Sequence, residues 1–160
     1  MTKESSFSAE KQAIVRHWRE SVPNDRLAHL VRDVARAQQR QLQQRLAEKG
    51  VTFGHWSFLR VLWAQDGLNQ KELSVQVGVM EPTTFAAVTA MEKLGYVHRR
   101  QIEGNRKNSH VFLTPFGAGL QQELVPLAEQ VNALSIAGIK PAEIAQLRAL
   151  LLKMMANLTT

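Results

Sequence analysis

The sequence predicts a mainly α-helical protein with a small β-sheet of two or three strands. Most of the chain has apolar residues at helical spacing, and glycine, proline and capping residues divide it into segments of ordinary helix length. After Gly95 this pattern stops, and two short strand-like segments flank a polar turn. No uninterrupted apolar run reaches the ~20 residues that a membrane-spanning helix requires.

The composition favours a single domain in a reducing compartment. A chain of 160 residues, 44% of them hydrophobic, can bury one core. The absence of cysteine excludes thiol catalysis, thiol redox sensing and Cys-ligated zinc. The first residues offer no apolar stretch that could act as a signal peptide, so we expect a cytoplasmic protein. The net charge of +6 favours anionic partners without identifying one.

The first predicted elements are two helices. A short helix is expected at residues 9–20, separated from the next one by the segment SVPND. The second helix, residues 23–49, would be about 40 Å long at ~1.5 Å per residue, which is more than one small domain needs for itself. Gly50 follows its end. Its apolar residues recur at spacings of three, four or sums of these: Leu27, Leu30, Val31, Val34, Leu42 and Leu46.

Three shorter helices are expected next. The first lies in HWSFLRVLWAQDG, where Gly67 is the predicted stop. Asn69 can cap the second, in QKELSVQV, and Gly78 ends it. In the third, MEPTTFAAVTAMEKLG, Pro82 suits the first helical turn and Gly95 is the stop.

Two strands are predicted at residues 96–102 and 109–113, joined by turn residues with basic neighbours. Helices followed by a hairpin with a cationic tip are the order of a winged helix-turn-helix. That fold places one helix in a DNA major groove and its wing along the backbone or minor groove. Residues 55–114 are therefore predicted to form a DNA-binding lobe.

Two long helices are expected at the end of the chain. Thr114 and Pro115 suit the cap and first turn of one helix, and Pro126 inside it is expected to cause a kink. The last helix is expected at residues 141–158. Together with residues 24–50, residues 115–158 have more apolar surface than one winged lobe can cover. We therefore predict an obligate dimer through these helices, burying well over ~2,000 Å².

These segments together resemble the MarR family of bacterial transcriptional regulators. The resemblance rests on LNQKELSVQVGV, PTTFAAVTAMEKLGYVHR, GNRKNSHVFLTPFG and GIKPAEIAQLRALLLKMMANL, and it covers roughly residues 27–158. It implies a homodimer whose terminal helices intertwine, with two winged lobes that bind a pseudo-palindromic operator. It also implies a small-molecule pocket between each lobe and the dimer region.

The sequence departs from the family pattern in two places. The family often has a Thr-Arg pair at Phe85 and Ala86 and an Arg at Ala90, so this chain offers fewer guanidinium groups to guanine, while its apolar side chains suit thymine methyl groups. The usual Asp-x-Arg of the wing is here Asn105-Arg106-Lys107. The family's Asp–Arg pair is lost, and we expect the arginine of this segment to enter the minor groove and the lysine to contact phosphate.

The residues expected at the DNA lie at the starts of the second and third short helices, along the third helix and in the hairpin. They are Asn69, Gln70, Thr83, Thr84, Phe85, Ala86, Thr89, Arg99, Asn105, Arg106 and Lys107. Three alternatives remain open at this point. The basic hairpin residues could be merely solvated, one of the two adjacent threonines could be buried, and the phenylalanine could belong to the core.

A small-molecule site is expected beside the lobe. Trp56 and Arg60 stand four residues apart on one helical face, where an indole could stack on a planar ring and a guanidinium could hold its carboxylate bidentately. Trp63, His29 and Arg32 are the expected companions. The alternative is that both tryptophans are core and that the arginine pairs with an acid. The family resemblance implies an aromatic acid, a phenol or a pyridine carboxylate as the effector, and acyl thioesters stay open.

Neither metal binding, nor a cofactor, nor catalysis is expected. The five histidines form no i, i+4 pair on one helix, and there is no acyl-transfer elbow, phosphate loop or nucleophile with an evident base. We expect a ligand-responsive transcriptional regulator, a repressor released from operator DNA by a small aromatic acid or related compound. The alternative is a winged-helix adaptor for protein contacts, or an enzyme, that does not bind DNA.

Overall fold

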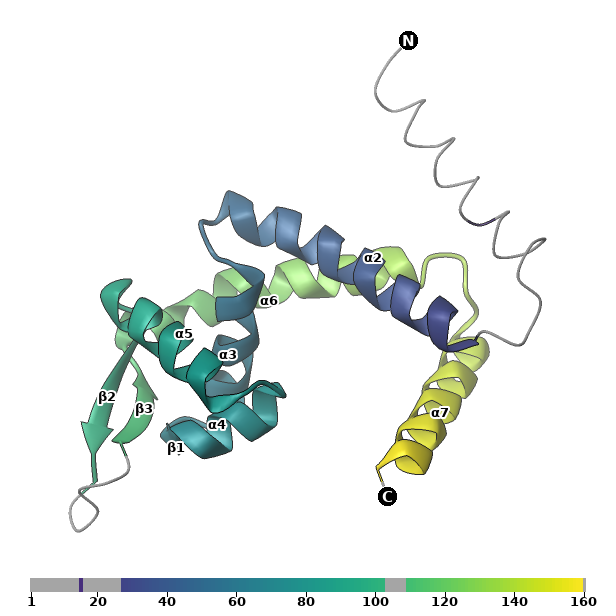
Figure 1. Cartoon of the computed structure of the whole chain (residues 1–160). Helices are drawn as coiled ribbons and strands as arrows, with labels where there is room; N and C mark the ends of the chain where they lie inside the picture. Colours follow the sequence, from purple (N-terminus) through teal and green to yellow (C-terminus); the bar gives the residue numbers. More distant parts are fainter. Residues whose placement is uncertain (1–14, 16–26, 103–108, 160) are drawn as a thin grey trace. The chain divides into compact units, whose positions relative to one another are not determined.

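The computed structural model describes residue 15, residues 27–102 and residues 109–159. The chain divides into two compact units, residues 1–40 and residues 41–160. Helix α2 (Leu27–Glu48) spans the boundary, and every later element belongs to the second unit (Figure 1). The short helix expected at residues 9–20 and the expected start of the long helix before Leu27 lie outside the described residues. The prediction of a mainly helical fold with a small sheet is confirmed.

Three short helices form the first part of the second unit: α3 (Phe53–Ala64), α4 (Gln70–Val77) and α5 (Glu81–Lys93). The side chain of Thr52 caps α3 by accepting a hydrogen bond from the backbone N–H of His55 at 3.1 Å. Helix α3 ends at Ala64, three residues before the predicted stop at Gly67. That glycine instead takes a positive φ of 76° in the turn that follows.

The sheet has three antiparallel strands in the order β1-β3-β2. Strands β2 (Val97–Gln101) and β3 (Ser109–Leu113) form the predicted hairpin, and β2 is one residue shorter at each end than expected. Strand β1 (Leu68–Asn69) pairs with β3 through Val111 and His110. Two residues are too few to show a strand pattern in the sequence, which is why only the wider range of two or three strands could be predicted.

Two long helices complete the second unit. Helix α6 (Pro115–Ser135) begins at Thr114, whose hydroxyl accepts a hydrogen bond from the backbone N–H of Gly117 at 3.0 Å. Helix α6 continues through Pro126 without a break. Helix α7 (Pro141–Leu158) has the predicted bounds.

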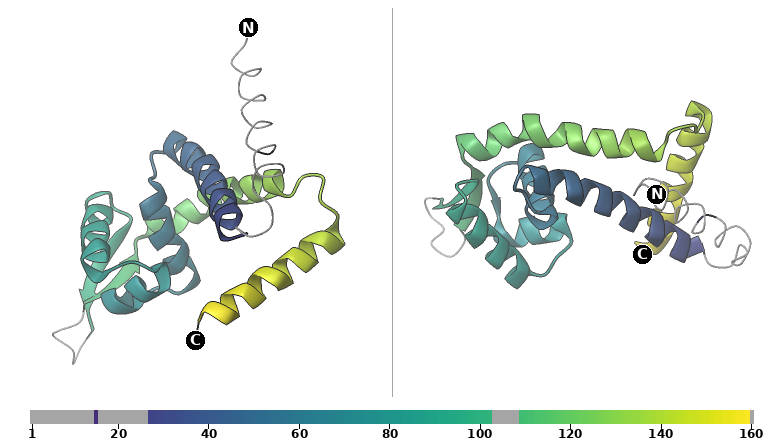
Figure 2. Two further views of the ribbon diagram at one scale, coloured as in Figure 1. Left: turned by 45° about the vertical axis from the view of Figure 1, so that its right-hand side comes forward. Right: turned by 90° about the horizontal axis from the view of Figure 1, so that it is seen from above.

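The core of the second unit lies where α3, α4 and α5 pack against α6, the sheet and the end of α2. Its fully buried side chains include Leu46, Leu59, Leu62, Leu73, Val88, Met91, Val111 and Leu124. Both views of Figure 2 show the β2–β3 hairpin beside α5, and these elements are in contact. This packing determines which face of α5 is left at the surface.

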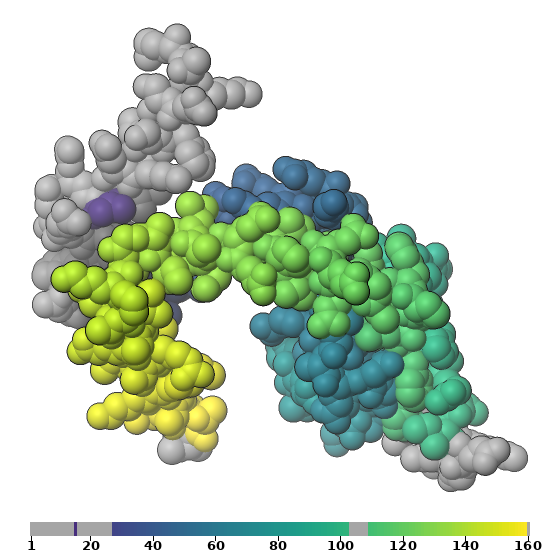
Figure 3. Space-filling view, turned by 180° about the vertical axis from the view of Figure 1, so that it is seen from behind, coloured from purple at the N-terminus to yellow at the C-terminus, as the bar shows by residue number. Residues whose placement is uncertain are grey.

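Several helices present apolar side chains that the described chain leaves uncovered. No residue of α7 is buried, and its side chains lie at the surface along the helix (Figure 3). The exposed apolar residues of α7 are Leu147, Leu150, Leu151, Leu152, Met155 and Leu158. In the first unit, α2 likewise exposes Leu27, Leu30 and Val34. Within the described ranges, no helix has the length and apolar character required to cross a membrane.

Candidate nucleic-acid interface

Helices α4 and α5 form a helix-turn-helix whose inner surface contains a polar pair. The side chains of Ser74 and Thr84 are 3% and 0% exposed, and their hydroxyl oxygens lie 2.8 Å apart. Gly78, at the end of α4, takes a positive φ of 79° and donates its N–H to the Ser74 carbonyl at 2.9 Å. The buried position overturns the expectation that Thr84 contacts DNA, and it confirms the alternative that one of the two adjacent threonines is buried.

The opposite face of α5 lies at the surface. Thr83, Phe85 and Ala86 are exposed, while Val88 and Met91 point into the core. The phenylalanine is 55% exposed, so the alternative that its ring belongs to the core is wrong. Helix α5 therefore presents one hydroxyl, one aromatic ring and one methyl group on adjacent exposed positions.

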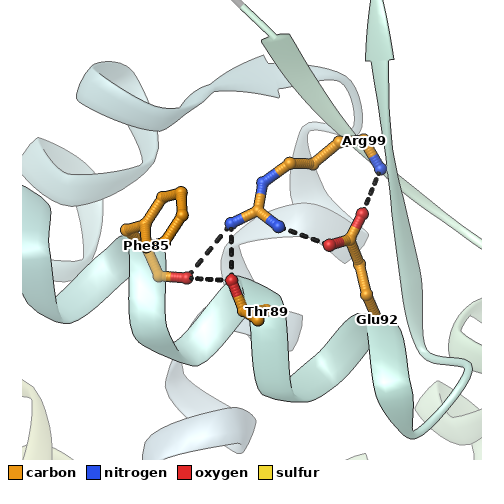
Figure 4. Close-up of polar contacts among 4 residues, drawn as sticks. All are labelled: Phe85, Thr89, Glu92 and Arg99. Atoms are coloured by element: carbon orange, nitrogen blue, oxygen red, sulfur yellow. Dashed lines mark hydrogen bonds and ion pairs between the residues drawn. The ribbon is translucent and has the colours of Figure 1, made fainter.

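A polar cluster joins α5 to β2, and we call Phe85, Thr89, Glu92 and Arg99 the Arg99 cluster (Figure 4). The Nη1 atom of Arg99 forms an ion pair with Oε2 of Glu92. The Nη2 atom donates hydrogen bonds to the Phe85 carbonyl and to the Thr89 hydroxyl, both at 3.1 Å. The backbone N–H of Arg99 donates to Oε1 of Glu92 at 2.8 Å. One glutamate thus binds both the side chain and the backbone of the same strand residue.

The Arg99 guanidinium also lies over an aromatic ring. Its central carbon is 4.7 Å from the centroid of the Phe85 ring, within the range of a cation–π contact. The side chain of Arg99 is mostly buried, and its charge faces the carboxylate of Glu92. These contacts differ from the expectation of an arginine directed at DNA. They place Arg99 between the hairpin and α5.

The start of α4 is fixed by a capping box. The side chain of Asn69 accepts a hydrogen bond from the backbone N–H of Glu72 at 2.9 Å, and Glu72 Oε2 accepts one from the backbone N–H of Asn69 at 3.0 Å. Gln70, the first residue of α4, is partly buried. The predicted capping role of Asn69 is confirmed, and the cap fixes where the first N–H groups of α4 point.

The hairpin stacks its own basic and aromatic side chains. The guanidinium carbon of Arg100 lies 4.4 Å from the ring centroid of Phe112, and the ring of His98 stacks on the same phenylalanine at 5.9 Å. The expected wing contacts Asn105, Arg106 and Lys107 lie outside the described residues.

The comparisons with known proteins agree on one family. Residues 51–109 match the model of the MarR family, and this range contains α3, α4, α5 and the whole of β2. The chain contains a MarR-family domain. The resemblance noted in the sequence is thereby confirmed.

Individual relatives extend the similarity beyond residues 51–109. The HTH-type transcriptional regulator TtmR of Methylorubrum extorquens (strain PA1) is 26% identical over 112 residues, which are 70% of this chain and 57% of that protein. The chain therefore spans little more than half the length of this curated relative. A MarR transcriptional regulator from Methanosarcina mazei Go1 has the same fold, with a TM-score of 0.77 at 24% identity over 84% of this chain and 96% of that one.

A third relative was solved with nucleic acid. It is a MarR-family regulator from Listeria monocytogenes in complex with a 26mer DNA. It has a TM-score of 0.75 at 26% identity and covers 84% of this chain and 89% of its own.

Two of the expected ligand residues of the MarR-family domain pack inside it. Trp56 is 6% exposed and meets Trp63 edge to face, with ring centroids 5.6 Å apart. The indole N–H of Trp63 donates a hydrogen bond to the Gly117 carbonyl of α6 at 2.9 Å. The alternative that the tryptophans are packing residues is therefore supported.

The other expected ligand residues are exposed. Arg60 lies at the surface of α3, and no acidic side chain within the described ranges is at ion-pair distance from it, contrary to the alternative of an acidic partner. His29 and Arg32 are exposed on α2 in the first unit, where Arg32 Nε lies 3.3 Å from Oδ1 of Asp33. Among the described residues, the arginine of α3 is thus the guanidinium of this set that has no carboxylate at ion-pair distance.

One histidine of the MarR-family domain has a shifted pKa. Burial lowers the pKa of His55 below its ordinary value of 6.5, because the charged form loses hydration. The ring meets Tyr96 edge to face, with centroids 6.3 Å apart. Within the described ranges, no three potential metal-ligating side chains gather into a group that could hold a metal ion.

Proposed function

We propose that this chain is a DNA-binding transcriptional regulator in which α5 is the recognition helix and enters the major groove of duplex DNA. The observation that supports this most is the division of α5 into two faces. One face packs Thr84, Val88 and Met91 into the core, and the other exposes small, hydroxyl-bearing and aromatic side chains beside a basic hairpin. A helix-turn-helix uses such a face to reach base edges.

The residues divide into those that contact bases and those that position the protein. Thr83, Phe85 and Ala86 meet base edges, since they form the exposed face of α5. Asn69 and Gln70 place the start of α4 at the phosphate backbone, where helix N–H groups favour an anion. The wing contributes Arg106 in the minor groove and Lys107 at phosphate, with Asn105 beside them. The complex of the Listeria monocytogenes relative with a 26mer DNA supports duplex DNA as the partner.

The functional state is a homodimer that binds a pseudo-palindromic operator. Helices α2, α6 and α7 leave apolar side chains exposed to water, and a second copy of the chain would bury them. Residues 24–50 and 115–158 are the proposed dimerisation segments. The symmetry of such a dimer would match two operator half-sites.

A small aromatic carboxylate is the proposed effector, and it would release the regulator from DNA. Arg60 is the proposed carboxylate-binding group, because it is exposed and a guanidinium binds a carboxylate bidentately. The buried position of Trp56 favours a supporting role for that indole. Trp63, in the same unit as Arg60, remains a proposed companion. Because a ligand shifts an equilibrium only through different affinities for two states, the effector must bind the DNA-free arrangement more tightly.

Selection from a randomised 30-base-pair duplex pool tests the DNA-binding function directly. We expect repeated rounds to enrich a sequence whose two halves are related by two-fold symmetry. Binding to this sequence should weaken steeply as the salt concentration increases, because phosphate contacts release counterions. An unenriched pool, bound without dependence on salt, would contradict the proposal. It would leave a protein-interaction adaptor or an enzyme as the function.

A further inference from the structure

Before its last residue, the exposed face of α5 lacks the side chains that usually identify guanine. From Glu81 to Glu92 the helix contains neither Lys nor Arg. Both Nη atoms of Arg99, which reaches α5 from β2, are bonded within the Arg99 cluster. Guanine is most often recognised by an arginine or lysine that binds its O6 and N7 atoms. Up to Glu92, α5 therefore offers no such contact to guanine; its one lysine, Lys93, is the last residue of the helix.

The face instead presents apolar groups to the groove. The Phe85 ring is 55% exposed, and the methyl group of Ala86 is exposed next to it in the chain. In the major groove the apolar feature of a base pair is the C5 methyl group of thymine. A 5-methylcytosine places a methyl group on the same ring carbon. Contact with such a methyl group is the favourable way to remove this phenylalanine from water.

The position of the ring is fixed before DNA arrives. Arg99 lies over one face of the Phe85 ring at 4.7 Å, and its Nη2 atom binds the carbonyl of the same residue at 3.1 Å. Glu92 and Thr89 hold the guanidinium in turn. One face of the ring is thus occupied and the rest is left for a ligand. A ring that is already ordered loses less conformational entropy on binding.

We propose that Phe85, positioned by Arg99, makes α5 a reader of pyrimidine C5 methyl groups, so that the protein distinguishes thymine from uracil and 5-methylcytosine from cytosine. This inference rests on the proposed function, since it requires α5 to lie in the major groove. Phe85 contacts the base, and Arg99 is a positioning residue.

The test uses duplexes chosen by selection from the randomised pool and then resynthesised with single-base changes. Deoxyuridine replaces each thymine in turn, which removes only the methyl group. At the contacted position we expect about a four-fold loss of affinity, since burying one methylene corresponds to roughly that factor. Cytosine and 5-methylcytosine are then compared at the same position, and the methylated base should bind more tightly by a similar factor.

Variants assign the effect to the ring. Phe85→Ala should remove both methyl preferences and leave the salt dependence unchanged, because the ring has no charge. Phe85→Leu should keep part of the preference. Arg99→Met should reduce the thymine-over-uracil ratio, and Arg99→Lys should restore it only in part, because lysine has no planar fork. Circular dichroism and thermal unfolding would show that each variant is folded.

Two results would overturn the inference. Equal affinity of the parent protein for thymine and uracil duplexes at every position would show that no methyl group is read. A thymine preference that survives in folded Phe85→Ala would assign the reading to another residue. A protein that does not bind DNA would give a different result. The selection would then enrich no duplex, and the duplexes with single-base changes could not be made.

Discussion

The hydroxyl oxygens of Ser74 and Thr84 lie 2.8 Å apart in the buried interface between α4 and α5. Ser74 Oγ also lies 2.7 Å from the backbone carbonyl of Gln70. Because a hydroxyl has a single proton, we assign Ser74 as the donor to that carbonyl and Thr84 as the donor to Ser74. The pair joins the two helices of the helix-turn-helix from within.

Replacing Thr84 by valine should affect stability and leave DNA binding unchanged. Valine nearly keeps the shape but removes the hydroxyl that bonds to Ser74, so we expect the free energy of unfolding to fall by about 1 kcal/mol. Urea denaturation measures this loss, and fluorescence anisotropy with a selected duplex measures affinity. Unchanged stability combined with weaker DNA binding would instead place this side chain at the DNA.

Two glycines of α6 should respond in opposite ways to alanine. A Cβ on Gly117 would lie 1.9 Å from the backbone oxygen of Tyr96, so Gly117→Ala must displace the start of α6 and should cost about 3 kcal/mol or more. Apart from the neighbouring backbone of its own helix, no atom of the described residues lies within 4 Å of a Cβ built on Gly119, and Gly119→Ala should gain about 0.5–1 kcal/mol from helix propensity. Denaturant unfolding of both variants checks the pair. Equal stabilities would contradict the close packing of α6 on Tyr96.

Stability should fall on acidification through His55. Burial lowers the pKa of this histidine in the folded state, so folding favours its neutral form. The contribution is present above the unfolded-state pKa of about 6.5, and it is lost as the pH falls from there through the lower folded-state pKa. Urea midpoints should therefore be lower at pH 5.5 than at pH 7.5, and His55→Gln should narrow this difference. If the urea midpoint of His55→Gln depended on pH as strongly as that of the parent, the effect would belong to other groups.

Removing the wing charges should weaken DNA binding electrostatically. Arg106→Ala with Lys107→Ala should lower affinity by roughly 10- to 100-fold and reduce the log-log salt slope by about one to two for each wing. The charge-matched control removes Arg148 and Lys153, which are exposed on α7 within the proposed dimerisation segment, and sedimentation would show that this variant keeps the parent's oligomeric state. We expect that control to keep the parent's salt slope. Equal slopes in all three proteins would show that the wing does not contact phosphate.

The effector proposal depends on Arg60. Benzoate and nicotinate are suitable probes, and we expect at least one of them to weaken binding of the parent protein to a selected duplex. Arg60→Ala should bind DNA within about two-fold of the parent but lose this response, and Arg60→Lys should recover only part of it, because the bidentate geometry is missing. Gel shifts on the three proteins measure the response. An alanine variant that responds like the parent, or fails to fold, would remove Arg60 from the ligand site.

The features that the sequence predicted well depend on neighbouring residues. The caps by Asn69 and Thr114 and the bounds of α7 follow from residues within one helical turn of each other. Strand β1 was not located, because its pairing with β3 joins residues some forty positions apart.

Within the candidate site, the contacts of Arg99 were the main feature that local patterns missed. Its partner Glu92 precedes it by seven residues on the other side of the turn at Gly95, and no helical or strand period relates the two. For a related reason, local patterns do not decide whether Thr84 is buried or Phe85 is exposed. Consecutive residues of a helix point to different faces. Which face of α5 is buried depends on how α4 packs against it, and composition does not reveal this.

We propose above all that this protein binds duplex DNA with sequence specificity. The most direct test compares the affinity for a selected duplex with that for a shuffled duplex of the same composition, by fluorescence anisotropy at about 0.15 M salt. We predict that the selected duplex binds about 1,000-fold or more tightly. Equal affinities for the two duplexes would show that the protein does not recognise a DNA sequence.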